Sequence, residues 1–151
     1  MIFVRKFLLL SNLLFFLCFS NGQAQQTKPF ETVVSFFEAF HQKDSSALAT
    51  YFDKGAHLNF TTNDKDGNPQ KRSMSIQDFI SRVCNRAETP VWEERLGEPK
   101  VVVHQNLATI WVPFEFYLDS RRSHSGYNLF QLFWNGSEWK IINLADTRET
   151  D

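Results

Sequence analysis

The sequence predicts an α+β fold in which three helices in the N-terminal half pack on one face of a strongly curved antiparallel sheet. Before residue 87, apolar residues recur at three- and four-residue spacing in three segments, which is the period of amphipathic helices. From residue 91 onward, segments rich in aromatic and β-branched residues alternate with turn-forming stretches, a pattern typical of strands joined by hairpins. Helices followed by a run of long strands indicate that the helices cover one face of the sheet.

The first 24 residues have the layout of a secretory signal. Two basic residues precede an apolar run over residues 7–19, and the small residues Gly22 and Ala24 follow it. An apolar run of about a dozen residues is too short to span a bilayer. We therefore expect cleavage after Ala24, a mature chain over residues 25–151 that forms a single domain, and a secreted or periplasmic location.

The cysteines and the charge disfavour several classes of protein. Lipid attachment at Cys18 would require small residues before it, whereas Phe16 and Leu17 stand there. Once Cys18 is removed, Cys84 is the single remaining thiol, so the mature chain has no intramolecular disulfide to form. The full chain has a net charge of −1 at pH 7. Neither nucleic acid nor, after cleavage, a membrane surface is therefore the expected partner.

Helix signals stand at three places in the N-terminal half. Pro29 opens a segment whose apolar residues share one helical face. Asp44 is placed to cap a short helix over residues 45–52, which we expect to end at Gly55. Ser75 begins a capping box, which predicts a third helix over residues 75–86.

Strand patterns occupy most of the remaining chain. Residues 56–62 alternate between apolar and polar side chains, and residues 63–69 form a polar turn. The aromatic and β-branched segments of the C-terminal half predict an antiparallel meander. Its strands are expected at residues 91–103, 107–119, 126–135 and 138–146.

Three features, taken in this order, resemble the nuclear transport factor 2-like superfamily of cone-shaped α+β domains. They are the Phe-rich first helix, the helix over residues 44–52 that leads into the strand with His57, and the closing Gly136-Ser137-Glu138-Trp139-Lys140-Ile141. The resemblance implies a pocket, often apolar, between the concave sheet and the helices, and frequently a homodimer through the outer sheet face. The superfamily includes ketosteroid isomerase, scytalone dehydratase, polyketide cyclases and many non-catalytic members, so the fold does not decide the function.

Three residues are candidates for catalysis. Isomerase-type chemistry in this fold uses a carboxylate base in an apolar pocket, where burial tunes its pKa toward proton abstraction. Glu115 and Asp146 are candidate bases, and His57 could serve a dehydratase. Glu115 alternates in phase with Trp111 and Tyr117, whereas the opposite parity is more apolar and comprises Ile110, Val112, Phe114, Phe116 and Leu118. If the more apolar parity is interior, Glu115 points outward.

Five polar residues are candidates for ligand binding. Tyr127 and Gln131 share a strand face with apolar residues, so they would be polar points in an apolar lining if that face is interior. Arg148 stands two residues beyond the carboxylate that ends the last strand, and the two would share a face in extended chain. Asn59 and Tyr117 complete the set.

No cofactor or metal ion is expected, because the four His residues lack ligand spacing and no phosphate-binding loop is present. The favoured function is a non-catalytic domain that holds a small apolar molecule. An isomerase or dehydratase, and a dimeric interaction module, remain as alternatives. The aromatic sheet face with Trp111, Pro113 and Tyr117 predicts a homodimer.

Overall fold

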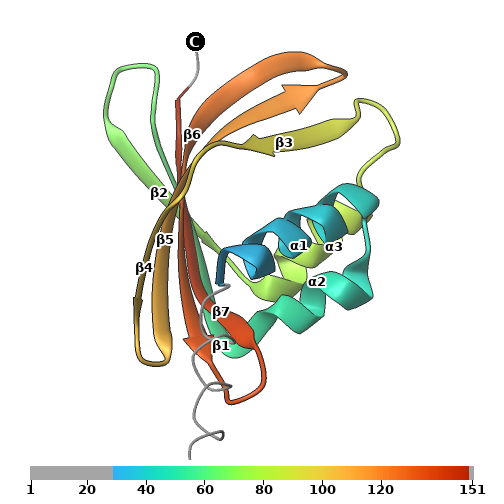
Figure 1. The fold of residues 1–151 in the computed structure, drawn as a ribbon. Coiled ribbons are helices and arrows are strands. Elements are labelled where there is room, and N and C mark those ends of the chain that lie inside the picture. Colours follow the sequence, from blue (N-terminus) through green and yellow to red (C-terminus); the bar gives the residue numbers. More distant parts are fainter. Residues whose placement is uncertain (1–28, 150–151) are drawn as a thin grey trace, which may run out of the picture.

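A computed structural model describes residues 29–149 of the protein. The predicted signal segment, its cleavage site and Cys18 lie outside these residues. Figure 1 shows three helices grouped on one side of a curved sheet. The elements, in chain order, are α1 (Pro29–Gln42), α2 (Ser45–Tyr51), β1 (Phe52–Asn63), β2 (Pro69–Met74), α3 (Ile76–Cys84), β3 (Trp92–Leu96), β4 (Lys100–His104), β5 (Leu107–Leu118), β6 (Arg121–Trp134) and β7 (Trp139–Arg148).

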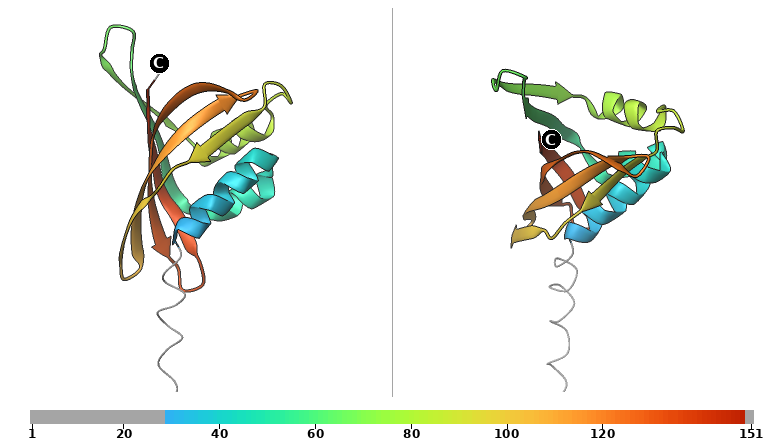
Figure 2. Two further views of the ribbon diagram at one scale, coloured as in Figure 1. Left: turned by 45° about the horizontal axis from the view of Figure 1, so that its top comes forward. Right: turned by 90° about the horizontal axis from the view of Figure 1, so that it is seen from above.

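The sheet has seven strands in the order β2-β1-β7-β6-β5-β3, and β4 also pairs with β5. The predicted α+β class is confirmed, but the sheet is mixed, because β1 and β7 run parallel while the other pairs are antiparallel. These two strands come from opposite ends of the domain, so no hairpin fixes their direction. The sheet is open, and its curvature gives the cone shape seen in Figure 2.

The predicted helix caps are present. The Asp44 side chain accepts a hydrogen bond from the backbone N–H of Ala47 at 2.9 Å, at the start of α2. Ser75 Oγ accepts from the backbone N–H of Asp78 at 3.0 Å, at the start of α3. Each cap satisfies a backbone donor that the first helical turn leaves unpaired. Within residues 29–149, no helix is both long and apolar enough to cross a membrane.

The predicted boundaries around the first two strands were wrong. The chain passes from α2 into β1 at Phe52, so Gly55 lies within the strand and does not end the helix. β2 was missed because most of its side chains are polar and almost all are exposed. Backbone pairing with β1 forms this edge strand, and side-chain burial contributes little.

The predicted strand over residues 91–103 is two strands, β3 and β4. Gly97 and Pro99 lie between them, and proline cannot donate a ladder hydrogen bond. The two strands pair with different halves of β5. This break leaves β3 free to turn toward α1.

The core lies between α1 and the concave face of the sheet. The ring of Phe36, which is 1% exposed, packs edge-on against Phe130 and Phe52 at centroid distances of 5.9 and 5.6 Å. The apolar parity of β5 is interior, as expected: its buried members are Ala108, Ile110, Val112, Phe114 and Phe116. The concave face is thus the apolar one on this strand, and Glu115 points outward with the opposite parity.

Candidate functional site

A cavity of about 900 Å³ opens between the concave face of the sheet, α1 and α3. This volume lies in the range of pockets that bind small molecules. Aromatic side chains supply much of its wall: Phe36, Phe37, Phe40, Phe60, Phe79, Trp92, Phe114 and Phe116. The many Phe residues of the sequence therefore form the wall of this cavity as well as part of the core.

Strand register arranges the concave face in rows, because paired residues of neighbouring strands share a face. One row crosses five strands: Arg72, Phe60, Asp146, Asn128 and Val112. The next row toward the core is wholly apolar: Met74, Leu58, Leu144, Phe130 and Ile110. Arg72, Asp146 and Asn128 therefore lie along one line of the cavity wall, next to an apolar floor.

Glu94 on β3 faces this row from across the cavity. Asn128 Nδ2 donates a hydrogen bond to Glu94 Oε1 at 2.7 Å. Burial raises the pKa of Glu94 to about 8, and the nearby charge of Asp146 adds to the rise, while the bond from Asn128 opposes it. At neutral pH the carboxyl group of Glu94 is therefore mostly protonated and can donate a hydrogen bond to a ligand.

His41 holds the backbone of Glu94. Its Nε2 accepts a hydrogen bond from the Glu94 backbone N–H at 2.9 Å. This bond requires an unprotonated Nε2, and burial lowers the pKa of His41, which keeps the ring neutral. Helix α1 thus fixes the position of Glu94 in the cavity wall.

Asp146 on β7 is the second acid of the cavity. Burial raises its pKa to about 7, while the backbone hydrogen bond of Thr61 and the charges of Arg148 and Arg72 oppose the rise. Asp146 therefore exists in both protonation states near neutral pH. A carboxyl group with such a pKa in an apolar cavity can accept or release a proton.

His124 on β6 also lines the cavity. Its ring stacks on Phe116 at a centroid distance of 4.9 Å and meets Phe114 edge-on at 5.8 Å. Burial, aided by the charge of Arg148, lowers the pKa of His124 to about 4. The ring is neutral under ordinary conditions and offers one donor and one acceptor.

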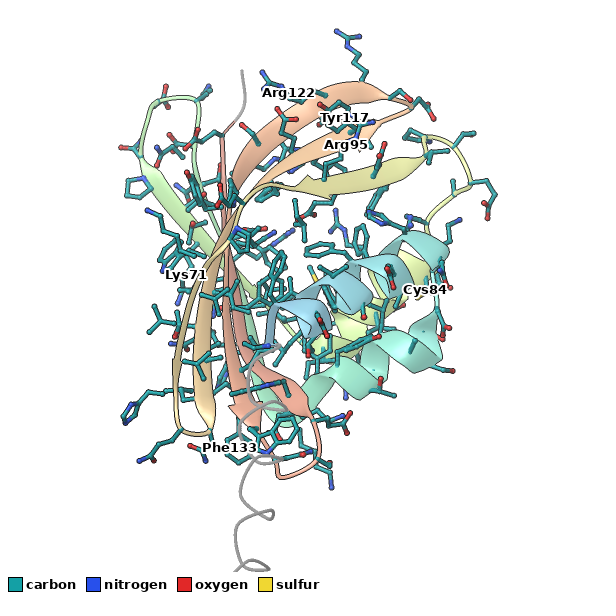
Figure 3. The ribbon with its side chains drawn as sticks, in the orientation of Figure 1. Lys71, Cys84, Arg95, Tyr117, Arg122 and Phe133 are labelled. Atoms are coloured by element: carbon teal, nitrogen blue, oxygen red, sulfur yellow. The ribbon has the colours of Figure 1, made fainter. Side chains whose placement is uncertain are left out.

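Of the predicted site residues, Asp146 and Arg148 line the cavity. Glu115 and Tyr117 do not, because their parity on β5 faces the convex side. There the Tyr117 hydroxyl donates to Glu115 Oε2 at 2.8 Å, and Arg122 pairs with Glu115 at 3.2 Å. These two contacts, that of Tyr117 first, lower the pKa of Glu115. Figure 3 shows Tyr117, Arg122 and Arg95 at one end of the sheet.

The other candidates also lie outside the cavity lining. Tyr127 is 48% exposed, and Gln131 shares its parity, because Asn128 and Phe130 occupy the concave face of β6. His57 is exposed. Asn59 accepts a hydrogen bond from the Ser73 hydroxyl at 2.8 Å.

Sequence reasoning missed Glu94, Asn128 and His124. A signal for Glu94 was present: Trp92, Glu94 and Leu96 alternate in phase, which places a carboxyl group between two apolar neighbours. Among residues 29–149, no cluster of three or more His, Cys, Asp or Glu side chains is arranged to hold a metal ion.

No protein-family model matches the sequence, and no curated protein matches it. Solved structures do match. The chain has the nuclear transport factor 2-like fold. A nuclear transport factor 2-like protein from Cytophaga hutchinsonii ATCC 33406 matches with a TM-score of 0.60 and 12% identity, over 80% of this chain and 94% of that one. A similar protein of unknown function from Shewanella baltica OS155 gives 0.56 and 14%, over 81% and 91%.

The same fold occurs in the beta subunit of a proposed aromatic-ring-hydroxylating dioxygenase from Novosphingobium aromaticivorans DSM 12444. Its TM-score is 0.68 at 9% identity, over 85% of this chain and 92% of that subunit. At identities this low, the structural matches establish the shared fold alone. The function must therefore be inferred from the residues of the cavity.

Proposed function

We propose that the chain is a small-molecule-binding domain whose ligand, mainly apolar, occupies the cavity. The observation that carries this proposal is a space of about 900 Å³, walled by aromatic rings and crossed by one row of polar groups. Apolar area supplies most of the affinity, at about 25 cal/mol per Å² removed from water. Asn128, Glu94 and Asp146 supply the hydrogen bonds that orient the ligand.

Binding is tested with N-phenyl-1-naphthylamine, an uncharged fluorescent probe that brightens in apolar surroundings. Ser123 lines the cavity from β6, whereas Ser125 pairs with Glu115 on the convex side. Ser123→Trp should weaken probe binding by about tenfold or more by filling the space, while Ser125→Trp leaves it unchanged. Saturable binding that neither substitution alters would contradict the proposal.

A second candidate function is proton-transfer catalysis. The observation that favours it is the pair of acids Glu94 and Asp146, with pKa values of about 8 and 7, on one cavity. One of them in its ionised form would take a proton from a carbon acid, while the other in its protonated form would donate a hydrogen bond to the developing negative charge.

5-Nitrobenzisoxazole tests this second function without knowledge of the natural substrate. A base removes its ring C–H proton, the C–H electrons form a nitrile, and the N–O bond breaks to release a coloured cyanophenolate. Catalysis should rise with pH as Asp146 ionises near pH 7, and Asp146→Asn should lower it by about a hundredfold. If the wild-type protein and the Asn variant reacted at the same rate, proton-transfer catalysis by Asp146 would be contradicted and binding would remain the proposed function.

We infer that the domain acts after export. The support is the signal-like layout of residues 1–24. Mass spectrometry of the exported chain should give Gln25 as the first residue. A mature chain that begins with lipid-modified Cys18 would overturn both the cleavage site and the unanchored state.

A further inference from the structure

Four basic side chains line the cavity: Lys71, Arg72, Arg82 and Arg148. All four are exposed, so they lie where the cavity meets solvent. They come from β2, α3 and β7, which are separate elements. Below, they are called the basic rim; Figure 3 labels Lys71 among them.

No ion pair within the described part of the chain neutralises the positive charge of the basic rim. Among residues 29–149, ion pairs join Lys43, Arg95, Arg122 and Lys140 to glutamates, and none involves a rim residue. The guanidinium group of Arg72 lies over the ring of Phe60 at 5.2 Å, a contact that leaves its N–H donors available.

The acids of the cavity offset little of this charge. Glu94 is mostly protonated at neutral pH and Asp146 partly so, for the reasons given above. Four cationic groups thus face at most about one negative charge in the cavity, in a chain whose net charge is −1. The local excess of positive charge therefore contrasts with the molecule as a whole.

We propose that the ligand is an anionic amphiphile, with its apolar body among the aromatic rings and its carboxylate, sulfonate or similar group at the basic rim. This inference rests on the proposed binding function and adds the charge of the ligand to it. Arg72 and Arg148 are the principal contacts. Arg72 lies on the same row as Asp146, Arg148 stands two residues beyond Asp146 on β7, and both charges act on the Asp146 carboxyl group. Guanidinium groups donate paired hydrogen bonds to planar or tetrahedral anions.

Two probes with one body separate the anion from the apolar part. 8-Anilinonaphthalene-1-sulfonate and N-phenyl-1-naphthylamine differ by the sulfonate group alone. We expect the wild-type protein to bind the sulfonate about tenfold more tightly than the neutral probe at low salt, and this preference should shrink as salt is added.

Arg72→Gln combined with Arg148→Gln should bring the sulfonate affinity down to that of the neutral probe and leave the neutral probe within about threefold. Lysine at both positions should restore most of the preference, because it keeps the charge. Lys100→Gln, an exposed change on β4 outside the cavity lining, is the control for loss of one positive charge.

The outcomes are distinct. Equal affinity for the two probes in the wild-type protein, or tighter binding of dodecyltrimethylammonium than of dodecanoate in a displacement assay, overturns the anionic ligand but keeps the binding function. Failure to bind either probe overturns the binding function and this inference with it. A preference for sulfonate that survives the double Gln variant removes Arg72 and Arg148 as its source and contradicts the proposal.

Discussion

The two faces of the sheet shift the pKa values of neighbouring carboxyl groups in opposite directions. Glu94 faces the cavity, where burial raises its pKa to about 8. Glu93, one residue earlier, faces outward and pairs with Arg95 at 2.8 Å, a contact that lowers its pKa. One step along a strand thus separates a neutral acid from a charged one, because alternation exchanges solvent for aromatic rings.

The convex face nevertheless carries many apolar groups of its own. Register forms a stripe there in which Trp111 pairs with Leu129, and Leu107 with Phe133. Trp111 is 45% exposed and Phe133 36% exposed. The faces therefore differ less in apolar content than in enclosure: helices close over the concave side, whereas no element within residues 29–149 covers the stripe. Enclosure by the helices, and not composition, gives the concave face its cavity.

The largest effect is expected at Gly126, where β6 approaches β7. An added Cβ would lie 2.0 Å from the Thr147 carbonyl oxygen, and backbone cannot swing aside as a side chain can. Gly126→Ala should therefore destabilise the fold by about 3 kcal/mol or more in urea unfolding. Gly55→Ala is the control, since its Cβ would have 3.9 Å to its nearest contact. Equal stability of the two variants would show that β6 can shift away from β7 at Gly126 without a loss of stability.

The second effect concerns pH and sharpens the comparison between Glu94 and Glu93. The pKa of Glu94 in the folded protein, about 8, lies above the ordinary glutamate value of 4.5, so the folded state binds this proton more tightly than the unfolded state. Its contribution to stability is complete below pH 4.5 and is lost as pH rises toward 8. The loss is on the order of a few kcal/mol.

Glu94→Gln should remove much of this decline, because the amide cannot ionise and its oxygen can still accept from Asn128. Urea unfolding at intervals from pH 5 to 9 measures it. Glu93→Gln is the matched control, and its curve should keep the wild-type decline. A Glu94→Gln protein that loses as much stability as wild type would assign the decline to Asp146 or to other groups.

Sequence reasoning predicts much of this fold because its strongest signals are local. The caps at Asp44 and Ser75 satisfy helix donors within three residues, and the parity of β5 follows from Ile110 to Phe116 without any partner strand. The parallel pairing of β1 with β7 is different, since it joins segments far apart in the chain. No local pattern specifies it.

The site is less predictable because β6 is apolar on both parities. Because Leu129 and Phe133 alternate in phase with Tyr127, the sequence predicts an apolar face on that side of β6 as well as on the side of Asn128. Only the enclosure of one face by helices separates them. Asp146 and Arg148 could be predicted because they stand near the end of the last strand, whereas Glu94 acquires its cavity position from the turn of β3 toward α1.

The third prediction uses the uncovered convex stripe. A homodimer that pairs two stripes would bury them, and exposed apolar patches of this kind mark interaction surfaces. Sedimentation equilibrium at micromolar concentration should show a dimer, and Trp111→Ala should weaken it by about tenfold or more. Val91→Ala, an exposed change away from the stripe, should leave it intact. A wild-type monomer at these concentrations would rule the stripe out as a self-association surface.

The smallest effect is expected for Glu115→Gln, which tests the claim that a convex carboxyl group takes no part in the cavity. Glu115 loses its ion pair with Arg122, but both side chains are more than 40% exposed, and exposed pairs contribute little to stability. Its lowered pKa means that any contribution is present above the ordinary range of a glutamate and is lost as the medium becomes acidic. At pH 7 we therefore expect a Tm within about 2 °C of wild type and probe binding within about twofold.

Asp146→Asn, on the concave face, should by contrast change the pH dependence of binding near pH 7, because it removes the group that titrates there. If Glu115→Gln changed that pH dependence and Asp146→Asn did not, the two faces would have been assigned the wrong way round.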